Sequence, residues 1–416
     1  MATENPRVWF KSISLENVRS FGAKQTIYFT SDGTKDGELA QWNVILGDNG
    51  TGKTTVLKGL CLDEKGVTVS PHWFMREHKD AKVGIGRSDG TNVYEYRFKL
   101  HINVHRDGLY TTVEDTHPII EKGGDSHQKP YVFAYGAARR IGITGITEEQ
   151  AGTTKSLFDE NATLVNAEEL LIIADYSDLK NESIGNNKYG LVSSIIKRLL
   201  GQEIAGITIV PNALNRFGPP KVYFQTHYGK VLLHELSLGY KTLIAWMVDF
   251  AKGLLDRYPD SPDPLAEPAV CLVDEIDLHL HPKFQRSIIK FLTETFPNTQ
   301  FIVTAHSPLV VQSAQNANIV LLKREGDETH VAQGIDVHSW RIDQILSSDL
   351  FGEISSRPPA TEERMQRRRA LLLQDERTEQ ENQELARLEE ELGTLTAAES
   401  QEALKALELI SKSLTH

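Results

Sequence analysis

The stretch Gly47-Asp48-Asn49-Gly50-Thr51-Gly52-Lys53-Thr54-Thr55 decides the fold that we predict for this chain. Its pattern is G-x-x-x-x-G-K-[ST]. The apolar run 42–46 before it predicts a short buried strand, and residues 56–60 after it predict the first turns of a helix. In a chain of 416 residues the bare pattern arises by chance on the order of a percent of the time, because glycine makes up about 7% of residues. A strand, a glycine loop and a helix in this order favour a phosphate-binding loop over a chance turn.

The chemistry of phosphate binding explains why these residue types have this spacing. Glycines carry no Cβ, so successive backbone N–H groups can turn toward one phosphate chain. The N-terminus of the following helix adds its positive end. In such a loop Lys53 reaches the β and γ phosphates, and the Thr54 hydroxyl can ligate Mg²⁺. We therefore predict that residues 47–55 bind a nucleotide together with Mg²⁺.

Composition and charge exclude several classes of protein. Hydrophobic residues make up 40% of the chain and charged residues 25%, as in ordinary globular domains. No run of eighteen apolar residues occurs and the N-terminus has no apolar signal region, so no transmembrane helix is expected. Two buried thiols, Cys61 and Cys271, in a reducing cytoplasm are favoured over a disulfide. The net charge of −12 argues against whole-protein electrostatic binding to nucleic acid, although a local basic patch or a basic partner stays open.

A second motif begins at Leu236-Ser237-Leu238-Gly239-Tyr240-Lys241. After it, apolar residues recur at 243, 247, 250 and 254, which is the spacing of one helix face. Ser237 is placed as the N-cap of that helix. A hydroxyl and a glycine backbone at a helix N-terminus can form an anion site, and a simple capped helix is the alternative.

Two carboxylates follow the next apolar strand. Residues 268–273 predict a buried strand that ends in Asp274 and Glu275. In this position Asp274 would hold Mg²⁺ and Glu275 would orient and polarise the attacking water. An acidic strand end without chemistry is the alternative. A further core strand at 299–304 leads to His306, which we expect beside the γ-phosphate.

These four landmarks together resemble the ATP-binding-cassette class of ATPase, and specifically its SMC-like branch with DNA-repair and defence members. The resemblance covers roughly residues 8–325. It implies an α/β fold: a P-loop NTPase head with a mixed sheet, flanking helices and an antiparallel β subdomain. It also implies that ATP bound by Lys53 of one head is capped by Ser237, Gly239 and Lys241 of a second head. Two heads would then enclose two ATP, so at least a dimer is expected. Residues 61–235 would replace the long coiled coil of SMC proteins, and the glutamine loop of the class is not placed, since Gln128 is a poor candidate.

Three arginines have two interpretations each. Arg19, or an aromatic residue in 18–22, can pack on an adenine or can lie on a hairpin surface. Arg139 and Arg140 follow an apolar strand at 130–136, where they can contact phosphate or a neighbour, or form a solvated pair.

Two histidine groups suggest metal sites at first sight. His101, Asn103 and His105 occupy alternate positions at the end of one alternating strand, so a solvated face is favoured over a nuclease triplet. His279 and His281 are two residues apart, and a structural turn before the next helix is favoured over metal binding.

Apolar spacing predicts further elements along the chain. We expect strands at 13–18, 26–29, 93–102, 206–210, 221–226, 230–234 and 319–322, and helices at 167–174, 191–200 and 283–296. Otherwise residues 61–130 are polar and broken, and residues 141–166 predict loop.

The composition changes from Thr361 onward. Residues 361–416 contain 8 Lys and Arg and 13 Asp and Glu, and leucines at helical spacing predict two amphipathic helices broken near Gly393. The basic cluster at 364–369 can touch nucleic acid, but a charged helix face is favoured. Narrow apolar stripes call for a partner helix or subunit. We therefore expect two domains, an ATPase head at 1–345 and a helical, coiled-coil-like tail at 346–416.

Three local stretches, at 134–140, 275–282 and 340–346, resemble compact bacterial ATPases that are paired with nucleases in antiphage systems, above all the ATPase subunit of Septu-type defence (PtuA-like). The resemblance implies an ATPase with slow turnover that regulates a separate HNH nuclease subunit. It also implies a cytoplasmic location and no membrane partner. Whether the protein contacts nucleic acid indirectly stays open. The chain lacks the Toprim nuclease domain of the overcoming-lysogenization-defect family. An SMC-like DNA-repair ATPase and a non-hydrolytic nucleotide-dependent scaffold remain alternatives, whereas the tail and the insertion argue against a transporter ATPase.

Overall fold

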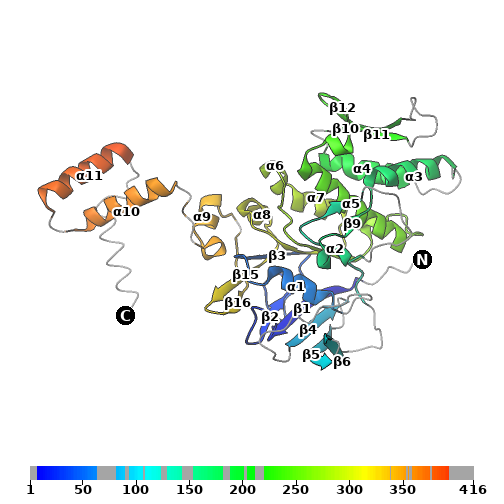
Figure 1. Cartoon of the computed structure of the whole chain (residues 1–416), viewed down its shortest axis with the longest axis horizontal. Helices are drawn as coiled ribbons and strands as arrows, with labels where there is room; N and C mark the ends of the chain where they lie inside the picture. Colours follow the sequence, from blue (N-terminus) through cyan, green and yellow to red (C-terminus); the bar gives the residue numbers. More distant parts are fainter. Residues whose placement is uncertain are drawn as a thin grey trace. The chain divides into compact units, whose positions relative to one another are not determined.

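The computed structural model divides the chain into two compact units, Met1–Trp340 and Arg341–His416 (Figure 1). The residues that it describes are 7–62, 81–89, 93–105, 108–122, 129–142, 153–180, 188–200, 204–210, 220–337, 339–352, 355, 358–374 and 377–392. The two units are described separately below.

A six-stranded sheet forms the centre of the first unit. Its order is β16-β15-β3-β14-β13-β7, and all pairs are parallel except β15 with the edge strand β16. The strands are β3 (Trp42–Gly47), β7 (Val132–Tyr135), β13 (Ala269–Val273), β14 (Thr299–Thr304), β15 (Asn318–Glu325) and β16 (Glu328–Ala332). β7, β13 and β14 are buried along their whole length, as expected for parallel strands covered on both faces.

The two faces of this sheet pack on different partners, because successive side chains of a strand point to opposite sides. On one face Ile45 and Ile302 join the core cluster that includes Val56 of helix α1 (Lys53–Leu60). On the other face the rings of Phe133 and Phe301 contact Phe250 of helix α5 (Leu238–Arg257), at centroid distances of 4.8 and 6.4 Å. The predicted α/β head with flanking helices is confirmed.

An antiparallel sheet in the order β2-β1-β4-β5-β6 shares the core of α1 (Figure 1). Its strands are β1 (Trp9–Glu16), β2 (Gln25–Tyr28), β4 (Ala81–Ser88), β5 (Val93–His105) and β6 (Gly108–Lys122). The predicted hairpin of β1 with β2 and the alternating strand β5 are present. The expectation of broken structure throughout 61–130 was wrong for β4 and β6. In β4, glycines take the place of apolar residues, since a Cβ at Gly84 would come within 2.5 Å of the Ser14 Oγ on β1.

The other described residues of the insertion at 61–235 form three helices, a short pair of strands and a small three-stranded sheet. These elements are α2 (Lys155–Phe158), α3 (Ala167–Lys180), α4 (Lys188–Leu200), the short pair β8 (Arg140–Ile141) and β9 (Thr163–Leu164), and the sheet β10 (Ile204–Val210), β11 (Lys221–Thr226) and β12 (Gly229–Leu232), with the 3-10 turn η2 (Leu233–Glu235) after it. The predicted helices and strands of this region are found, and the expected loop at 141–166 contains α2 and β9 as well.

The helix predicted at 283–296 is divided into α6 (Pro282–Gln285) and α7 (Ile288–Thr295), with α8 (Pro308–Ser313) following β14 and the 3-10 turn η3 (Pro264–Ala266) before β13. α6 is held by its Gln285 side chain, whose Nε2 donates to the carbonyl oxygens of Asp277 and Leu280, at 3.3 and 3.0 Å. Those contacts tie α6 to the loop after β13, and α7 begins at Ile288 with Ser287 as its N-cap.

The second unit contains α9 (Ile342–Leu346), the 3-10 turn η4 (Asp349–Phe351), α10 (Pro359–Leu373) and α11 (Glu379–Leu392). The basic cluster lies on α10 and faces acids of α11: Arg367 pairs with Glu384 at 2.7 Å, and Arg368 with Glu389 at 3.5 Å. The preference for a charged helix face over a nucleic-acid contact agrees with this pairing. The second predicted tail helix, which follows Gly393, lies outside the described residues. No helix in the described part of the chain combines the length and apolar character needed to cross a bilayer.

Candidate functional site

Three predicted motifs meet at one edge of the central sheet. β14 pairs with β3 on one side and with β13 on the other, all parallel. The C-terminal ends of these strands therefore lie side by side, and each leads directly into a motif: the glycine loop after β3, Asp274 and Glu275 after β13, and His306 after β14. Ligands of open α/β sheets bind at this edge.

The glycine loop has the backbone that its sequence predicts. Gly47, Gly50 and Gly52 have φ values of 142°, 82° and 95°, in the region that side chains disfavour. A Cβ at Gly47 would lie 2.4 Å from the Leu322 carbonyl oxygen, and one at Gly52 would lie 2.6 Å from the ring of Phe21. Both positions require glycine for space as well as for φ.

The remaining loop residues divide into a tip and a base. Asp48 and Asn49 are exposed at the tip, whereas Thr51 and Thr55 are buried. The Thr51 hydroxyl donates to the Asp48 carbonyl oxygen at 2.8 Å, which closes the loop.

Lys53 is folded back onto its own loop. Its Nζ donates to the carbonyl oxygens of Gly47 and Asp48, at 2.7 and 3.0 Å. Burial lowers the pKa of Lys53, and the nearby Asp274 acts in the opposite direction. A buried ammonium whose hydrogen bonds go to neutral carbonyl oxygens is well suited to an anionic ligand.

A short hydrogen-bond network joins Thr54 to both carboxylate residues. The Thr54 hydroxyl donates to Asp274 Oδ2 at 2.7 Å, and the Thr304 hydroxyl donates to Asp274 Oδ1 at 2.6 Å. Thr304 Oγ1 also accepts the backbone N–H of Glu275 at 2.7 Å. One hydroxyl and one carboxylate thus converge at a point, and such hard oxygen donors fit Mg²⁺.

Arg139 lies beneath this network. It is only 3% exposed, and its guanidinium donates to the backbone carbonyl oxygens of Gly136 at 3.1 Å, of Asp274 at 2.6 Å and of Glu275. Burial lowers the pKa of Arg139 to about 10, with Asp274 and Asp277 opposing the change. The guanidinium is therefore committed to the protein backbone, whereas the neighbouring Arg140 is exposed.

His306 is anchored through its backbone. Its N–H donates to Asp277 Oδ2 at 3.0 Å, and its side chain is exposed. Asp277 Oδ1 is buried without a hydrogen-bond partner among the described residues. Asp277 thus links the loop after β13 to the loop after β14.

The second motif forms the start of α5. Ser237 is its N-cap, as predicted, and accepts the backbone N–H of Tyr240 at 3.5 Å. A Cβ at Gly239 would lie 2.3 Å from the His279 carbonyl oxygen, so the helix start packs directly on the loop that follows Glu275. Lys241 Nζ donates to the His234 carbonyl oxygen at 3.3 Å.

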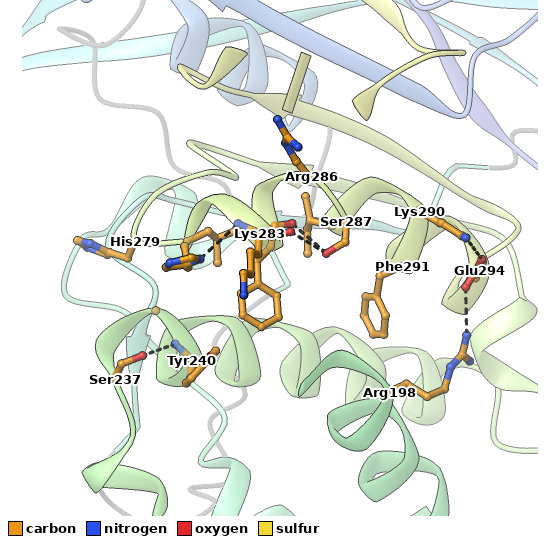
Figure 2. Close-up of a pocket in the computed structure, with 15 residues that line it drawn as sticks. Arg198, Ser237, Tyr240, His279, Lys283, Arg286, Ser287, Lys290, Phe291 and Glu294 are labelled. Carbon is orange, nitrogen blue, oxygen red and sulfur yellow. Dashed lines mark hydrogen bonds and ion pairs between the residues drawn. The ribbon is translucent and has the colours of Figure 1, made fainter. Parts of the chain in front are cut away.

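A cavity of about 1080 Å³ opens beside this motif and is lined by Ser237, Gly239, Tyr240 and residues of the 279–294 region. Figure 2 shows Phe291 directed from α7 toward the helices on the opposite side, and the ion pair of Arg198 with Glu294 at 3.8 Å at one end. None of the residues 47–55 lines this cavity. Within one chain, the two predicted parts of the nucleotide site therefore belong to different surfaces.

Several alternatives left open by the sequence now have an outcome. Phe21 is fully buried against the loop, so it is a core residue, while Arg19 is exposed. His281 Nδ1 accepts the backbone N–H of Lys283 at 3.3 Å, which makes it the cap of α6. No cluster of metal-binding residues occurs in the described part of the chain. The side chains of 101–105 lie outside the described residues.

Two residues of the site have no sequence signal of their own. Thr304 is the last residue of the strand β14, and Asp277 is one of several acidic residues that follow β13, so neither belongs to a recognisable motif. Arg139 had a partial signal, since it follows a core strand, but its backbone partners depend on the strand order.

Comparison with known proteins agrees with this architecture. One family profile, described as "AAA domain, putative AbiEii toxin, Type IV TA system", matches residues 212–312, and a second, described as "AAA domain", matches residues 12–130. The first covers Ser237, Gly239, Asp274 and Glu275, and the second covers the glycine loop.

Among curated proteins, the chain is similar to the Septu protein PtuA of Bacillus mycoides (strain KBAB4), at 24% identity over 371 residues, which is 85% of this chain and 46% of that protein. It is also similar to the retron Ec83 probable ATPase of Escherichia coli, at 41% identity over 127 residues, which is 30% of this chain and 22% of that protein. The chain thus spans less than half the length of these two relatives. Among solved structures, an Smc head bound to the C-terminal winged-helix domain of ScpA matches with a TM-score of 0.46 and 16% identity, over 78% of this chain and 97% of that one.

The similarity to the Septu protein PtuA and to a probable ATPase of a retron confirms the Septu-type resemblance that the motifs gave. The central sheet, its loop after β3 and the two AAA-domain matches agree with the predicted α/β fold of a P-loop NTPase.

Proposed function

We propose that this chain is the ATP-binding and ATP-hydrolysing subunit of an antiphage defence complex. The observation that carries the chemistry is the Thr304 hydroxyl, which contacts both Asp274 Oδ1 and the N–H of Glu275. A single side chain thereby fixes the two carboxylate residues relative to Thr54 at the end of the glycine loop. Such a fixed arrangement of acids beside a phosphate-binding loop supports phosphoryl transfer to water.

Each residue has a distinct part in the proposed reaction. Lys53 would exchange its loop carbonyl partners for the β and γ phosphates, and the loop N–H groups would bind the phosphate chain. Thr54 and Asp274 would hold Mg²⁺, which neutralises charge on the phosphates when bound. Glu275 would orient the attacking water and take its proton, and His306 would contact the γ-phosphate from the neighbouring strand.

We further propose that hydrolysis requires two heads. Ser237, Gly239 and Lys241 would cap the γ-phosphate held by Lys53 of a second copy, so that two ATP are enclosed between two heads. The cavity that Ser237 lines has none of the residues 47–55 of the same chain in its wall.

The cellular role is proposed from the similarity to Septu and retron ATPases. We propose a slow, regulatory ATPase in the cytoplasm, whose head-to-head association controls a separate nuclease subunit of the HNH type. Helices α10 and α11 of the second unit would serve contacts with that partner or with other copies. Contact with nucleic acid would then be made through the partner.

The variant Glu275→Gln tests the enzymatic proposal. It keeps the size of the side chain but removes the base, so ATP hydrolysis should fall at least about a hundredfold while ATP binding persists. The bound ATP should hold the heads together, and a dimer should appear by light scattering when ATP is added. Glu325→Gln, at an exposed carboxylate at the end of β15, is the matched control and should behave as wild type. Normal hydrolysis by Glu275→Gln would show that the role given to Glu275 is wrong.

A further inference from the structure

The backbone of Glu275 is held in a disfavoured conformation. Its φ is +50°, in the left-handed region that non-glycine residues rarely adopt. Glu275 lies just after the end of β13, immediately after Asp274, the residue proposed to hold Mg²⁺. A conformation of this kind persists only when the surrounding structure fixes it.

Contacts from two different elements fix this backbone. Its N–H donates to Thr304 Oγ1 at 2.7 Å, from the end of β14. Its carbonyl oxygen accepts from the Arg139 guanidinium, which also donates to the Asp274 carbonyl oxygen at 2.6 Å. The peptide unit between β13 and the following turn is thus bound on both sides.

The strand order places Arg139 there. β7 pairs with β13 in parallel, and the Asp274 N–H donates to the Tyr135 carbonyl oxygen at 2.8 Å. The turn 136–139 leaves β7 beside the end of β13, and Arg139 itself has a φ of +35°. A bond from its Nε to the Gly136 carbonyl oxygen, at 3.1 Å, orients the guanidinium.

Electrostatics add a second reason for a cation at this point. Three carboxylates, Asp274, Glu275 and Asp277, lie within four consecutive residues, and all three act on Arg139 electrostatically. A buried positive charge beneath them offsets their mutual repulsion. Replacing Arg139 by a neutral side chain would leave these acids without a compensating charge and three carbonyl oxygens without their donor.

We propose that Arg139 is a positioning residue for ATP hydrolysis, which sets the direction of the Glu275 carboxylate by holding its peptide carbonyl. Arg139 touches neither phosphate nor water in this role. The inference rests on the proposed role of Glu275 and extends it to a residue on a different strand.

The test compares Arg139→Met, Arg139→Lys and the control Arg140→Met in the full chain. Arg139→Met should lower kcat by about 10- to 100-fold, because small displacements of a catalytic group have effects of this size. ATP affinity, measured with a fluorescent ATP analogue, should change less than about threefold, since the glycine loop is untouched. Arg139→Lys keeps a cation and a donor, so it should recover part of kcat. Arg140→Met, at an exposed arginine next in sequence, should match wild type.

A double-variant cycle separates positioning from a general loss of structure. In the Glu275→Gln background the Arg139→Met change should cost little further activity, because the group that it positions is already inactive. Equal fold-losses in both backgrounds, or a fall in ATP affinity that accounts for the whole defect, would overturn the proposal. If Arg139→Met does not fold, Arg139→Lys replaces it in the same comparisons. The proposal would then also be overturned if Arg139→Lys had the kcat of wild type while its ATP hydrolysis still required Glu275. Failure of the proposed function is distinguishable, since Glu275→Gln alone would then hydrolyse ATP normally.

Discussion

Two threonines on β14 provide a sharp test of the network at the sheet edge. Thr304 and Thr299 are both 0% exposed and lie on the same strand. The Thr304 hydroxyl donates to Asp274 Oδ1 at 2.6 Å and accepts from the Glu275 N–H at 2.7 Å. The Thr299 hydroxyl has no hydrogen-bond partner among the described residues. Valine has nearly the same shape, so the two Thr→Val variants differ chiefly in the bonds that they remove.

The two variants should change the free energy of unfolding differently. A hydrogen bond to a charged group contributes about 1.5–3 kcal/mol, and leaving a buried N–H unpaired costs about 1–3 kcal/mol. Thr304→Val should therefore reduce the free energy of unfolding by about 3 kcal/mol, after allowing for the gain from a buried methyl group. Thr299→Val relieves a buried unpaired hydroxyl and should be neutral or stabilising by up to about 1 kcal/mol.

Thermal unfolding and steady-state phosphate release measure the two effects separately. Thr304→Val should lower the thermal midpoint by several degrees and kcat by at least about tenfold, because both carboxylate residues lose their orienting contact. Thr299→Val should leave kcat within about twofold of wild type, since it contacts neither residue. Equal effects of the two variants on stability and on kcat would refute the reasoning.

Two further predictions concern packing and pH. Gly239→Ala should destabilise the protein by about 1–3 kcal/mol and reduce ATPase activity, because its Cβ would lie 2.3 Å from the His279 carbonyl oxygen. The control Gly206→Ala, whose nearest neighbour would be 3.9 Å away, should unfold at the wild-type temperature, and an equal loss in both variants would contradict the packing argument. Burial lowers the pKa of Lys58 from 10.5 to about 8, so its charged form is disfavoured in the folded state. The resulting cost is complete below pH 8 and disappears as the pH rises toward 10.5. Lys58→Met should therefore raise the thermal midpoint by a few degrees at pH 7 and by much less at pH 10, and a pH-independent difference would speak against this origin.

Local patterns predict most of the architecture, because the central strands are buried on both faces and appear as short apolar runs. The glycine loop and the acids after β13 carry their chemistry in consecutive residues, so their spacing alone predicts the site. β4 was not predicted because its glycines and charged residues do not form the apolar run expected of a buried strand. Its Arg87 is nevertheless fully buried, with its guanidinium 4.6 Å from the centre of the Tyr96 ring.

The remaining parts of the site depend on which strands are neighbours. The pairing of β7 with β13 brings Arg139 to residues that are 135 positions away in sequence. The pairing of β14 with β13 does the same for Thr304, over 30 positions. Because strand order is decided by packing across the whole sheet, no local sequence pattern predicts either contact.

Mixing two inactive variants tests the proposal of shared nucleotide sites most directly. Lys53→Ala removes the lysine of the glycine loop, and Ser237→Arg blocks the capping motif, so each variant alone should lack ATPase activity. In a mixed dimer, Lys53 of one copy meets Ser237 of the other, and one of the two sites is intact. Random mixing should then restore roughly a quarter of wild-type phosphate release, because half of the dimers are mixed and each has one working site. Mixtures that stay inactive at every ratio, although mixed dimers are shown to form, would contradict the account.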